Sequence, residues 1–221
     1  MKIVTVTQDE LEDVLAQKLH ENGDQKLNNT NALFHLKNTM GEWKKEQNWP
    51  SPRAYEWVAK DDDGTMLGGT FITVTSRPPV HVTFRHIFLF EEARGKGVAE
   101  KLYNFRYQKA CEMGVKRVRV FANIPALPWH VKCGMRFLAM NKAKQPFTYL
   151  PLERFDTLRE YGEWLDSIGP RAAMDLVEPQ VTTQMEKIIS KGGRWYTDEE
   201  FIEQWGSPLA PKEGSSLEAF L

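Results

Sequence analysis

The residues with the clearest capacity for chemistry form a short glycine-rich stretch, Arg94-Gly95-Lys96-Gly97-Val98-Ala99. This stretch follows an apolar run at 86–90 and precedes a spacing of apolar residues that is typical of a helix. The two glycines allow the backbone to bend, so that successive N–H groups and the positive end of a helix can converge on an anion. The stretch therefore predicts a cradle for a phosphate-bearing ligand.

Two common nucleotide-binding patterns are excluded at this stretch. The dinucleotide fingerprint needs a third glycine where the chain has Glu100, and the triphosphate loop needs a Gly-Lys-Ser/Thr that does not occur here. The pattern instead resembles Q/R-x-x-G-x-G/A, the acyl-CoA pyrophosphate signature of the GNAT superfamily of N-acetyltransferases. Arg94, Gly97 and Ala99 match its three fixed positions.

A second motif about thirty residues downstream strengthens the resemblance. The segment 123–135 is similar to the family's N-x-x-A-x-x-F/W-Y-x-K-x-G-F, with five residues in register: Asn123, Ala126, Trp129, Lys132 and Gly134. Two positions depart from the pattern, because His130 replaces the usual tyrosine and Met135 replaces the usual aromatic residue. Together the two motifs cover roughly residues 80 to 150.

The resemblance implies direct transfer of an acetyl group from acetyl-CoA, as co-substrate, to an amine on a small molecule or a protein. It assigns the pyrophosphate to the loop residues Arg94, Gly95, Lys96, Gly97, Val98 and Ala99. It assigns the pantetheine and thioester to Ile87, Phe88 and Leu89, with Asn123 and Lys132 as further contacts. In relatives the fourth and fifth strands splay apart and the pantetheine lies between them. Asn123 has a simpler alternative, as a turn former at the end of a strand.

Candidate catalytic residues follow from the chemistry, since an amine must lose a proton before it attacks and the departing thiolate must gain one. His130 is the candidate general acid by its place in the motif, and its alternative is packing against Trp129 without a catalytic role. His86, Glu91 and His81 are candidate bases, and a water relay would need none of them. Arg85, in the middle of a strand, is expected to bind an anionic group of the acceptor or to pair with an acid of the C-terminal segment.

The pattern along the chain predicts an α/β fold of the GNAT type, with a mixed, mostly antiparallel sheet and helices on both faces. Strand patterns lie at 3–7, 55–60, 66–75, 80–90 and 115–121, and helix patterns at 9–20, 32–46, 97–113 and 126–132. A final hairpin is expected from 135–140 and 147–152. Arg106 and Lys109 interrupt the apolar face of the helix at 97–113. We expect both to extend their charged ends into solvent, and the alternative is that they reach toward a ligand.

Residues 1–152 are therefore expected to form the acetyltransferase domain, and 153–221 an acidic, mainly helical extension with a mobile tail. Helix patterns lie at 156–168 and 182–190, and a capping box at 197–200 starts a third helix. Three roles stay open for this extension: closing over the site, forming a homodimer contact, or taking no part in catalysis. The segment 22–54 is the expected place of acceptor selectivity, by analogy with the superfamily.

Charge is distributed unevenly along the chain. The formal net charge is −1, but residues 1–79 carry −3, residues 80–145 carry +9 and residues 146–221 carry −7. Three interpretations of the basic block 80–145 remain open: it receives a ligand with several phosphates, it meets a polyanion such as nucleic acid, or it pairs with the acidic flanks inside one fold.

Composition narrows the class of protein. At 221 residues with 41% hydrophobic content, the chain can bury a substantial core. Its two cysteines, Cys111 and Cys133, form no disulfide framework and no metal-ligand cluster, so we expect no metal and a reducing compartment. There is no signal-peptide pattern and no apolar run that could span a bilayer, which favours a cytoplasmic protein with no membrane partner.

Two alternatives to the amine acetyltransferase come from other classes. One is an enzyme of the same fold that modifies a nucleic-acid base, with Trp43, Trp49 and Trp57 available for stacking, although such tryptophans are more often core residues. The other is a non-catalytic acyl-CoA-binding or interaction protein, favoured by the absent tyrosine and by the lack of a carboxylate in the middle of the strand at 80–90.

Overall fold

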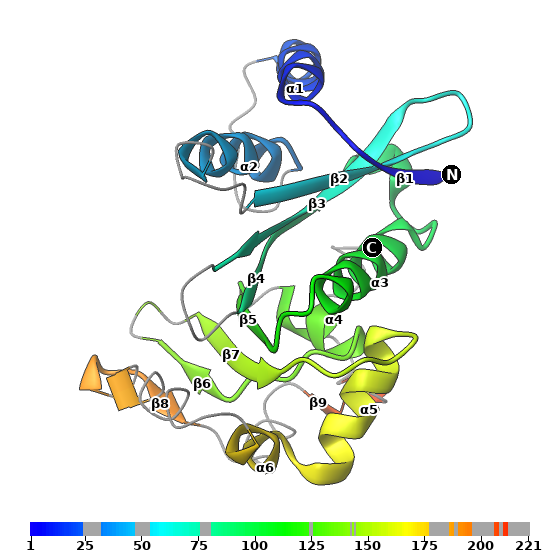
Figure 1. The fold of residues 1–221 in the computed structure, drawn as a ribbon. Helices are drawn as coiled ribbons and strands as arrows, with labels where there is room; N and C mark the ends of the chain where they lie inside the picture. The colour runs from blue at the N-terminus through cyan, green and yellow to red at the C-terminus, as the bar shows by residue number, and fades with distance from the viewer. Residues whose placement is uncertain are drawn as a thin grey trace. The chain divides into compact units, whose positions relative to one another are not determined.

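The computed structural model describes residues 1–23, 32–46, 54–75, 81–123, 126–141, 143, 145–176, 186–187, 190–195, 206–207 and 210–211. Figure 1 shows the chain as a ribbon. It divides into two compact units, the first made of residues 1–74 and 85–106, the second of residues 75–84 and 107–220. The boundary falls inside one strand and inside one helix, so each of these two elements contributes residues to both units.

The first unit contains an antiparallel sheet in the order β1-β2-β3-β4. Its elements are β1 (Lys2–Thr5), α1 (Gln8–Asn22), α2 (Ala32–Glu46), β2 (Ala54–Lys60), β3 (Met66–Val74), the second half of β4 (Val82–Leu89), the 3-10 turn η1 (Glu91–Ala93) and the first part of α3 (Val98–Glu112). β1 pairs with β2 and β2 with β3 in antiparallel register. The expected order of elements is confirmed, and α2 has the expected bounds.

Local sequence explains how several of these elements begin and end. The Thr7 side chain accepts a hydrogen bond from the Glu10 N–H and caps α1. In the β2–β3 hairpin, the Asp61 side chain accepts from the N–H groups of Asp63 and Thr65, and Gly64 takes a positive φ of 88°. These short-range contacts fix the register that brings Val58 opposite Gly69.

Helices cover both faces of the sheet in this unit, and two adjacent strand residues separate the two faces. Val58 belongs to a buried cluster with Leu11 of α1 and Leu36 and Met40 of α2. The next residue, Ala59, belongs to a different cluster with residues of α3. Because consecutive side chains of a strand point to opposite faces, α1 and α2 lie on one face and α3 on the other.

The second unit contains strands in the order β4-β5-β7-β6-β8. Besides the start of β4 and the end of α3, its elements are β5 (Arg117–Phe121), α4 (Leu127–Lys132), β6 (Ala139–Met140), β7 (Pro146–Pro151), α5 (Leu158–Ile168), α6 (Pro170–Asp175) and β8 (Arg194–Trp195), with a separate pair β9 (Gly206–Ser207) and β10 (Ala210–Pro211). β4 and β5 pair in parallel over residues 82–84 of β4 only. This short pairing is the divergence expected of the fourth and fifth strands.

The final hairpin is shorter than expected. Residues 135–138 are not strand, and β6 has two residues, Ala139 and Met140, which pair with β7 on one side and β8 on the other. The apolar residues at 135–138 are buried, but they fill the interior without a regular ladder. α6 and β8 were not anticipated from the sequence. The helix expected at 197–206 and the tail lie largely outside the described residues.

α5 packs closely on the loop that follows α4, and two glycines make this approach possible. A β-carbon on Gly134 would overlap the carbonyl oxygen of Leu158, and one on Gly162 would lie 2.5 Å from the Cα of Gly134. The hydroxyl of Tyr161 donates to the carbonyl of Pro151, and burial raises the pKa of this tyrosine well above its usual range. Tyr161 is therefore a neutral hydrogen-bond donor that holds α5 in place.

Two absences and the state of the cysteines concern the part of the chain that the structure describes. No helix there is long and apolar enough to cross a membrane. No group of three or more His, Cys, Asp or Glu side chains there could hold a metal ion. Cys111 and Cys133 are both free thiols, and burial raises the pKa of Cys111.

Candidate active site

The glycine-rich stretch 94–99, here called the glycine loop, leads from η1 into α3 in the first unit. Gly95 and Gly97 both have a φ of 70°, a conformation that other residues adopt only under strain. A β-carbon on either would meet no atom within 4 Å, so their conformation and not crowding calls for glycine. Arg94 through Gly97 are exposed, whereas Val98 and Ala99 are buried.

The start of α3 directs its backbone toward this exposed loop. The first N–H groups of a helix have no acceptor within the helix, and they carry its positive end. Two cationic side chains, Arg94 and Lys96, flank the glycines in the exposed part of the loop. Open space over two glycines, a helix N-terminus and two cations together suit a phosphate group.

The second half of β4 leads through Phe90 and η1 to this loop. Ile87 and Leu89 pack against the cluster on the α3 face, whereas Phe88 belongs to the cluster on the α1 and α2 face. The N–H of Phe90 donates to the carbonyl of Leu67, 3.0 Å away, which holds the end of β4 on β3. The end of the strand is therefore held in place where the chain enters η1 and then the loop.

The candidate bases of β4 and η1 have different surroundings. His86 is half-buried, and its ring centroid lies 5.7 Å from that of His35 on α2. Glu91 is exposed, and its carbonyl accepts from the N–H of Arg94 at the end of η1. Arg85 is half-buried on β4, where its Nε donates to the Thr73 hydroxyl at 3.2 Å. His86 thus faces the protein interior beside α2, and Glu91 faces solvent.

The residues of the second motif lie in the second unit around α4. His130 is 8% exposed, with its ring centroid 5.1 Å from Trp129 and 6.0 Å from Phe137. Lys132 is exposed at the end of α4. The carbonyl of Asn123 accepts from the Ala126 N–H at 3.0 Å, which is the turn anticipated as the alternative role of this residue.

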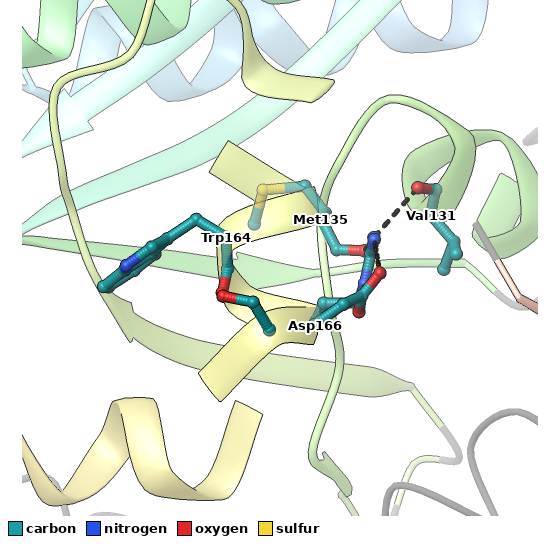
Figure 2. A network of polar contacts seen from close by, with 6 residues as sticks. Val131, Met135, Trp164 and Asp166 are labelled. Atoms are coloured by element: carbon teal, nitrogen blue, oxygen red, sulfur yellow. Dashed lines mark hydrogen bonds and ion pairs between the residues drawn. The ribbon is translucent and has the colours of Figure 1, made fainter. Parts of the chain in front are cut away.

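A buried arginine that sequence reasoning missed fixes the segment after α4. Arg136 is 2% exposed, and it donates to Asp166 of α5 through two nitrogens, Nε at 2.6 Å and Nη2 at 2.7 Å. Its Nη1 donates to the carbonyls of Val131 and Met135 at 3.0 and 2.8 Å. Figure 2 shows Val131 of α4 and Asp166 of α5 on the two sides of this contact. α5 therefore supports the helix that carries His130.

This contact also accounts for part of the basic block. Arg136 pairs with an acid of the acidic C-terminal segment. This is the third interpretation of the charge distribution, in which the basic block pairs with the acidic flanks inside one fold.

Arg106 was expected to reach solvent, and that expectation is wrong: it is fully buried, with its guanidinium 3.9 Å from the Tyr103 ring centroid. Arg117 is 4% exposed. The charges of Arg106, Arg117 and Arg136 are not displayed on the surface. Lys109 pairs with Glu112 on α3.

Glu56 of β2 is a buried acidic residue that sequence reasoning did not single out. It is 4% exposed, and neither of its carboxyl oxygens has a hydrogen-bond partner in the described part of the chain. Burial raises the pKa of this carboxyl well above its usual range. The sequence offered one weak signal, a single charged residue inside an otherwise apolar strand pattern. Trp57, next to it, is 5% exposed and contacts Phe105, so it is a core residue and not a free stacking platform.

The profile of the acetyltransferase (GNAT) family matches residues 26–135. No curated protein matches the chain significantly. The residues that the family profile matches include β4, the glycine loop, α3 and α4.

Solved structures of acetyltransferases resemble the chain as well. A GNAT-family acetyltransferase from Staphylococcus aureus Mu50 is 12% identical, covers 69% of this chain and 99% of its own, and has a TM-score of 0.47. A mutant of the spermidine N-acetyltransferase from Vibrio cholerae is 12% identical, with coverages of 68% and 93% and a TM-score of 0.49. An acetyltransferase from Trypanosoma brucei is 15% identical, with coverages of 61% and 92% and a TM-score of 0.41. Residues 26–135 of this chain therefore form a domain of the GNAT family of acetyltransferases.

Proposed function

We propose that this protein transfers the acetyl group of acetyl-CoA directly to an amine acceptor. The observation that carries the proposal is the succession of β4, the glycine loop and α3, in which two exposed glycines of positive φ, with open space beside them, directly precede the start of α3. The donor would be held by the backbone N–H groups of residues 94–99, with Arg94 and Lys96 next to the pyrophosphate. Ile87, Phe88 and Leu89 would contact the pantetheine and thioester, and Asn123 and Lys132 would complete the donor site.

The acceptor amine must reach the thioester carbonyl with its lone pair free. The proton leaves the amine for a base or a water, the nitrogen attacks the carbonyl carbon, and the C–S bond breaks as the tetrahedral oxyanion collapses. The CoA thiolate then takes up one proton. In this proposal His86 or Glu91 removes the amine proton, directly or through water, and His130 supplies the thiolate proton.

His86 is the better supported of the two bases. It lies on the α1 and α2 face of the sheet, beside His35, in a setting that excludes most solvent, whereas Glu91 is exposed. A neutral imidazole nitrogen can accept a proton, as a base in this role must. His130 is packed between two aromatic rings, which would hold its orientation.

Thermal unfolding with acetyl-CoA tests the donor site directly. A ligand at a hundred times its dissociation constant adds about 2.7 kcal/mol to the stability. For a chain of this size the midpoint should rise by about 5 to 10 °C. NAD and ATP are the controls, because they share the adenine and phosphates but not the acyl-pantetheine. A folded protein whose midpoint does not respond to acetyl-CoA would exclude the glycine loop as a CoA site.

Turnover tests the reaction. Release of free thiol from acetyl-CoA should depend on an added amine, and mass spectrometry should find the acetyl group on nitrogen. A His130→Phe variant should retain the acetyl-CoA midpoint shift while its kcat falls, because this change removes the proton donor and keeps the packing. An unchanged kcat in that variant would remove His130 from the mechanism without affecting the donor site.

A further inference from the structure

Glu56 is a buried carboxyl whose presence the packing of the first unit does not explain. Buried polar groups nearly always find a hydrogen-bond partner, since an unpaired one costs free energy on folding. Neither oxygen of Glu56 has such a partner among the described residues, although the residue is 96% shielded from solvent. An apolar side chain at this position would stabilise the fold. A buried carboxyl that lowers the stability of the fold is a candidate for a functional role.

The surroundings of Glu56 combine a carboxyl oxygen with an aromatic ring. A β-carbon on Gly69 of β3 would lie 3.0 Å from Glu56 Oε1 and 2.8 Å from Phe88 Cζ. Gly69 therefore leaves room for both side chains at one point of the sheet. A carboxylate and an aromatic ring next to each other attract a cation, the first by charge and the second by its π-system.

The neighbouring polar groups lie on the same face of the sheet. Val58, two residues after Glu56 on β2, belongs to the buried cluster that α2 completes with Leu36 and Met40. His86 lies two residues before Phe88 on β4, and its ring meets that of His35 on α2. Residues two apart in a strand share a face. Glu56, Phe88 and His86 thus belong to one face of the first unit, which α2 covers.

We propose that Glu56 and Phe88 bind a second basic group of the acceptor in its protonated form, so that the enzyme selects amines with two basic groups, such as diamines. This inference rests on the proposed function and names its substrate class. Without ligand the buried carboxyl keeps its proton, and it would ionise when a cation binds beside it. The resulting carboxylate suits the group that does not react, because pairing with the attacking amine would hold that amine protonated and prevent its attack. The reacting amine then remains free to meet His86 or a water.

Matched acceptors test the inference with the full-length protein. Linear diaminoalkanes of three to six carbons are compared with monoamines of the same chain length, by thiol release from acetyl-CoA. The wild type should have a KM at least ten-fold lower for its best diamine than for the matching monoamine. Glu56→Gln should raise the KM for the diamine at least ten-fold, and the ratio of the diamine KM to the monoamine KM should rise by a similar factor.

A control variant and a stability measurement separate this role from a structural one. Glu21→Gln changes an exposed carboxylate of α1 and should leave both KM values unchanged. Glu56→Met should raise the unfolding midpoint of the ligand-free protein and abolish the preference for diamines. A midpoint that falls in both Glu56 variants, with the diamine preference intact, would show that Glu56 is structural and would overturn the inference.

The remaining outcomes distinguish the inference from the function on which it rests. Wild-type turnover of diamines and monoamines with equal KM values overturns the inference and leaves the proposed function in place. If acetyl-CoA raises the midpoint but no amine releases thiol, the acceptor half of the proposed function fails, and the inference fails with it.

Discussion

The glycine loop and the contact between α4 and α5 use the same residue type for opposite purposes. Gly97 and Gly134 both have a positive φ, 70° and 107°. A β-carbon on Gly97 would stand in open space, whereas one on Gly134 would overlap the backbone of α5. In the first unit glycine leaves backbone accessible to a ligand, and in the second it lets two backbone segments touch. A glycine motif therefore has functional meaning only once its surroundings are known.

Two buried charged residues, one from each unit, also differ in their hydrogen bonding. Arg136 is 2% exposed and makes four hydrogen bonds, two of them to Asp166. Glu56 is 4% exposed and makes none within the described residues. Arg136 of the second unit is thus a paired, structural charge, whereas the Glu56 carboxyl of the first unit is buried without a hydrogen-bond partner among the described residues.

The largest expected effect is at Gly134. Gly134→Ala adds a β-carbon where the Leu158 carbonyl lies and also places alanine at a φ of 107°. We expect a loss of at least about 4 kcal/mol in the free energy of unfolding, because backbone on both sides must move. Urea unfolding measures it. Gly114→Ala, at a φ of 67° with open space, should cost only about 1–2 kcal/mol. Equal losses in the two variants would show that α5 does not pack on Gly134 as described.

Asp166→Ala should have the next largest effect, because it leaves the Arg136 guanidinium buried without its carboxylate. Loss of one partner from a fully buried pair costs about 3–5 kcal/mol, and we expect about 2 kcal/mol here. The smaller value reflects the 38% exposure of Asp166 and the two backbone carbonyls that remain as acceptors. Urea unfolding of Asp166→Ala, Arg136→Met and the double variant measures the coupling. If the two side chains pair, the double variant should lose less stability than the sum of the losses in the two single variants. A loss equal to that sum would refute the pairing.

Gly97→Ala sharpens the contrast with Gly134. Because a β-carbon at Gly97 meets no other atom, the variant should lose only the stability that backbone strain costs, about 1–2 kcal/mol. The same β-carbon should block the approach of a phosphate, so the rise in midpoint with acetyl-CoA should fall by more than half. Gly64→Ala, in the β2–β3 turn at a φ of 88°, carries the same kind of strain and should keep the full rise. A full rise in both variants would exclude Gly97 from the donor site.

The smallest effect is a pH dependence at Glu56. Burial raises the pKa of this carboxyl in the folded state, so the folded protein holds its proton after the unfolded chain has lost it. Its contribution to stability is therefore complete below the unfolded pKa of about 4.3 and is lost as pH rises through the folded pKa. The thermal-unfolding midpoint of Glu56→Gln should exceed that of the wild type by a margin that grows between pH 4 and pH 8. A difference that stays constant over this range would show that Glu56 does not keep a raised pKa.

Sequence reasoning succeeded where local rules decide the structure. The bounds of α2, the β2–β3 turn at Asp61–Gly64 and the passage from β4 through the glycine loop to α3 follow from residues close together in the chain. It was wrong at 135–138, where an apolar run suggested a strand, because period alone does not distinguish a strand from a buried irregular segment. The roles of His130, His86 and Glu91 stay predictions.

What the sequence by itself determined is the family and the chemistry that its two motifs allow, since short spacings fix glycines, a helix start and a strand end. Only the tertiary structure decided which charged side chains are buried and what they meet. Arg106 looked like a surface cation and stacks on Tyr103, while Arg136 found Asp166 thirty residues away. Glu56 stood alone in its strand and received no partner at all within the described chain. Burial depends on contacts between distant segments, and no local pattern contains them.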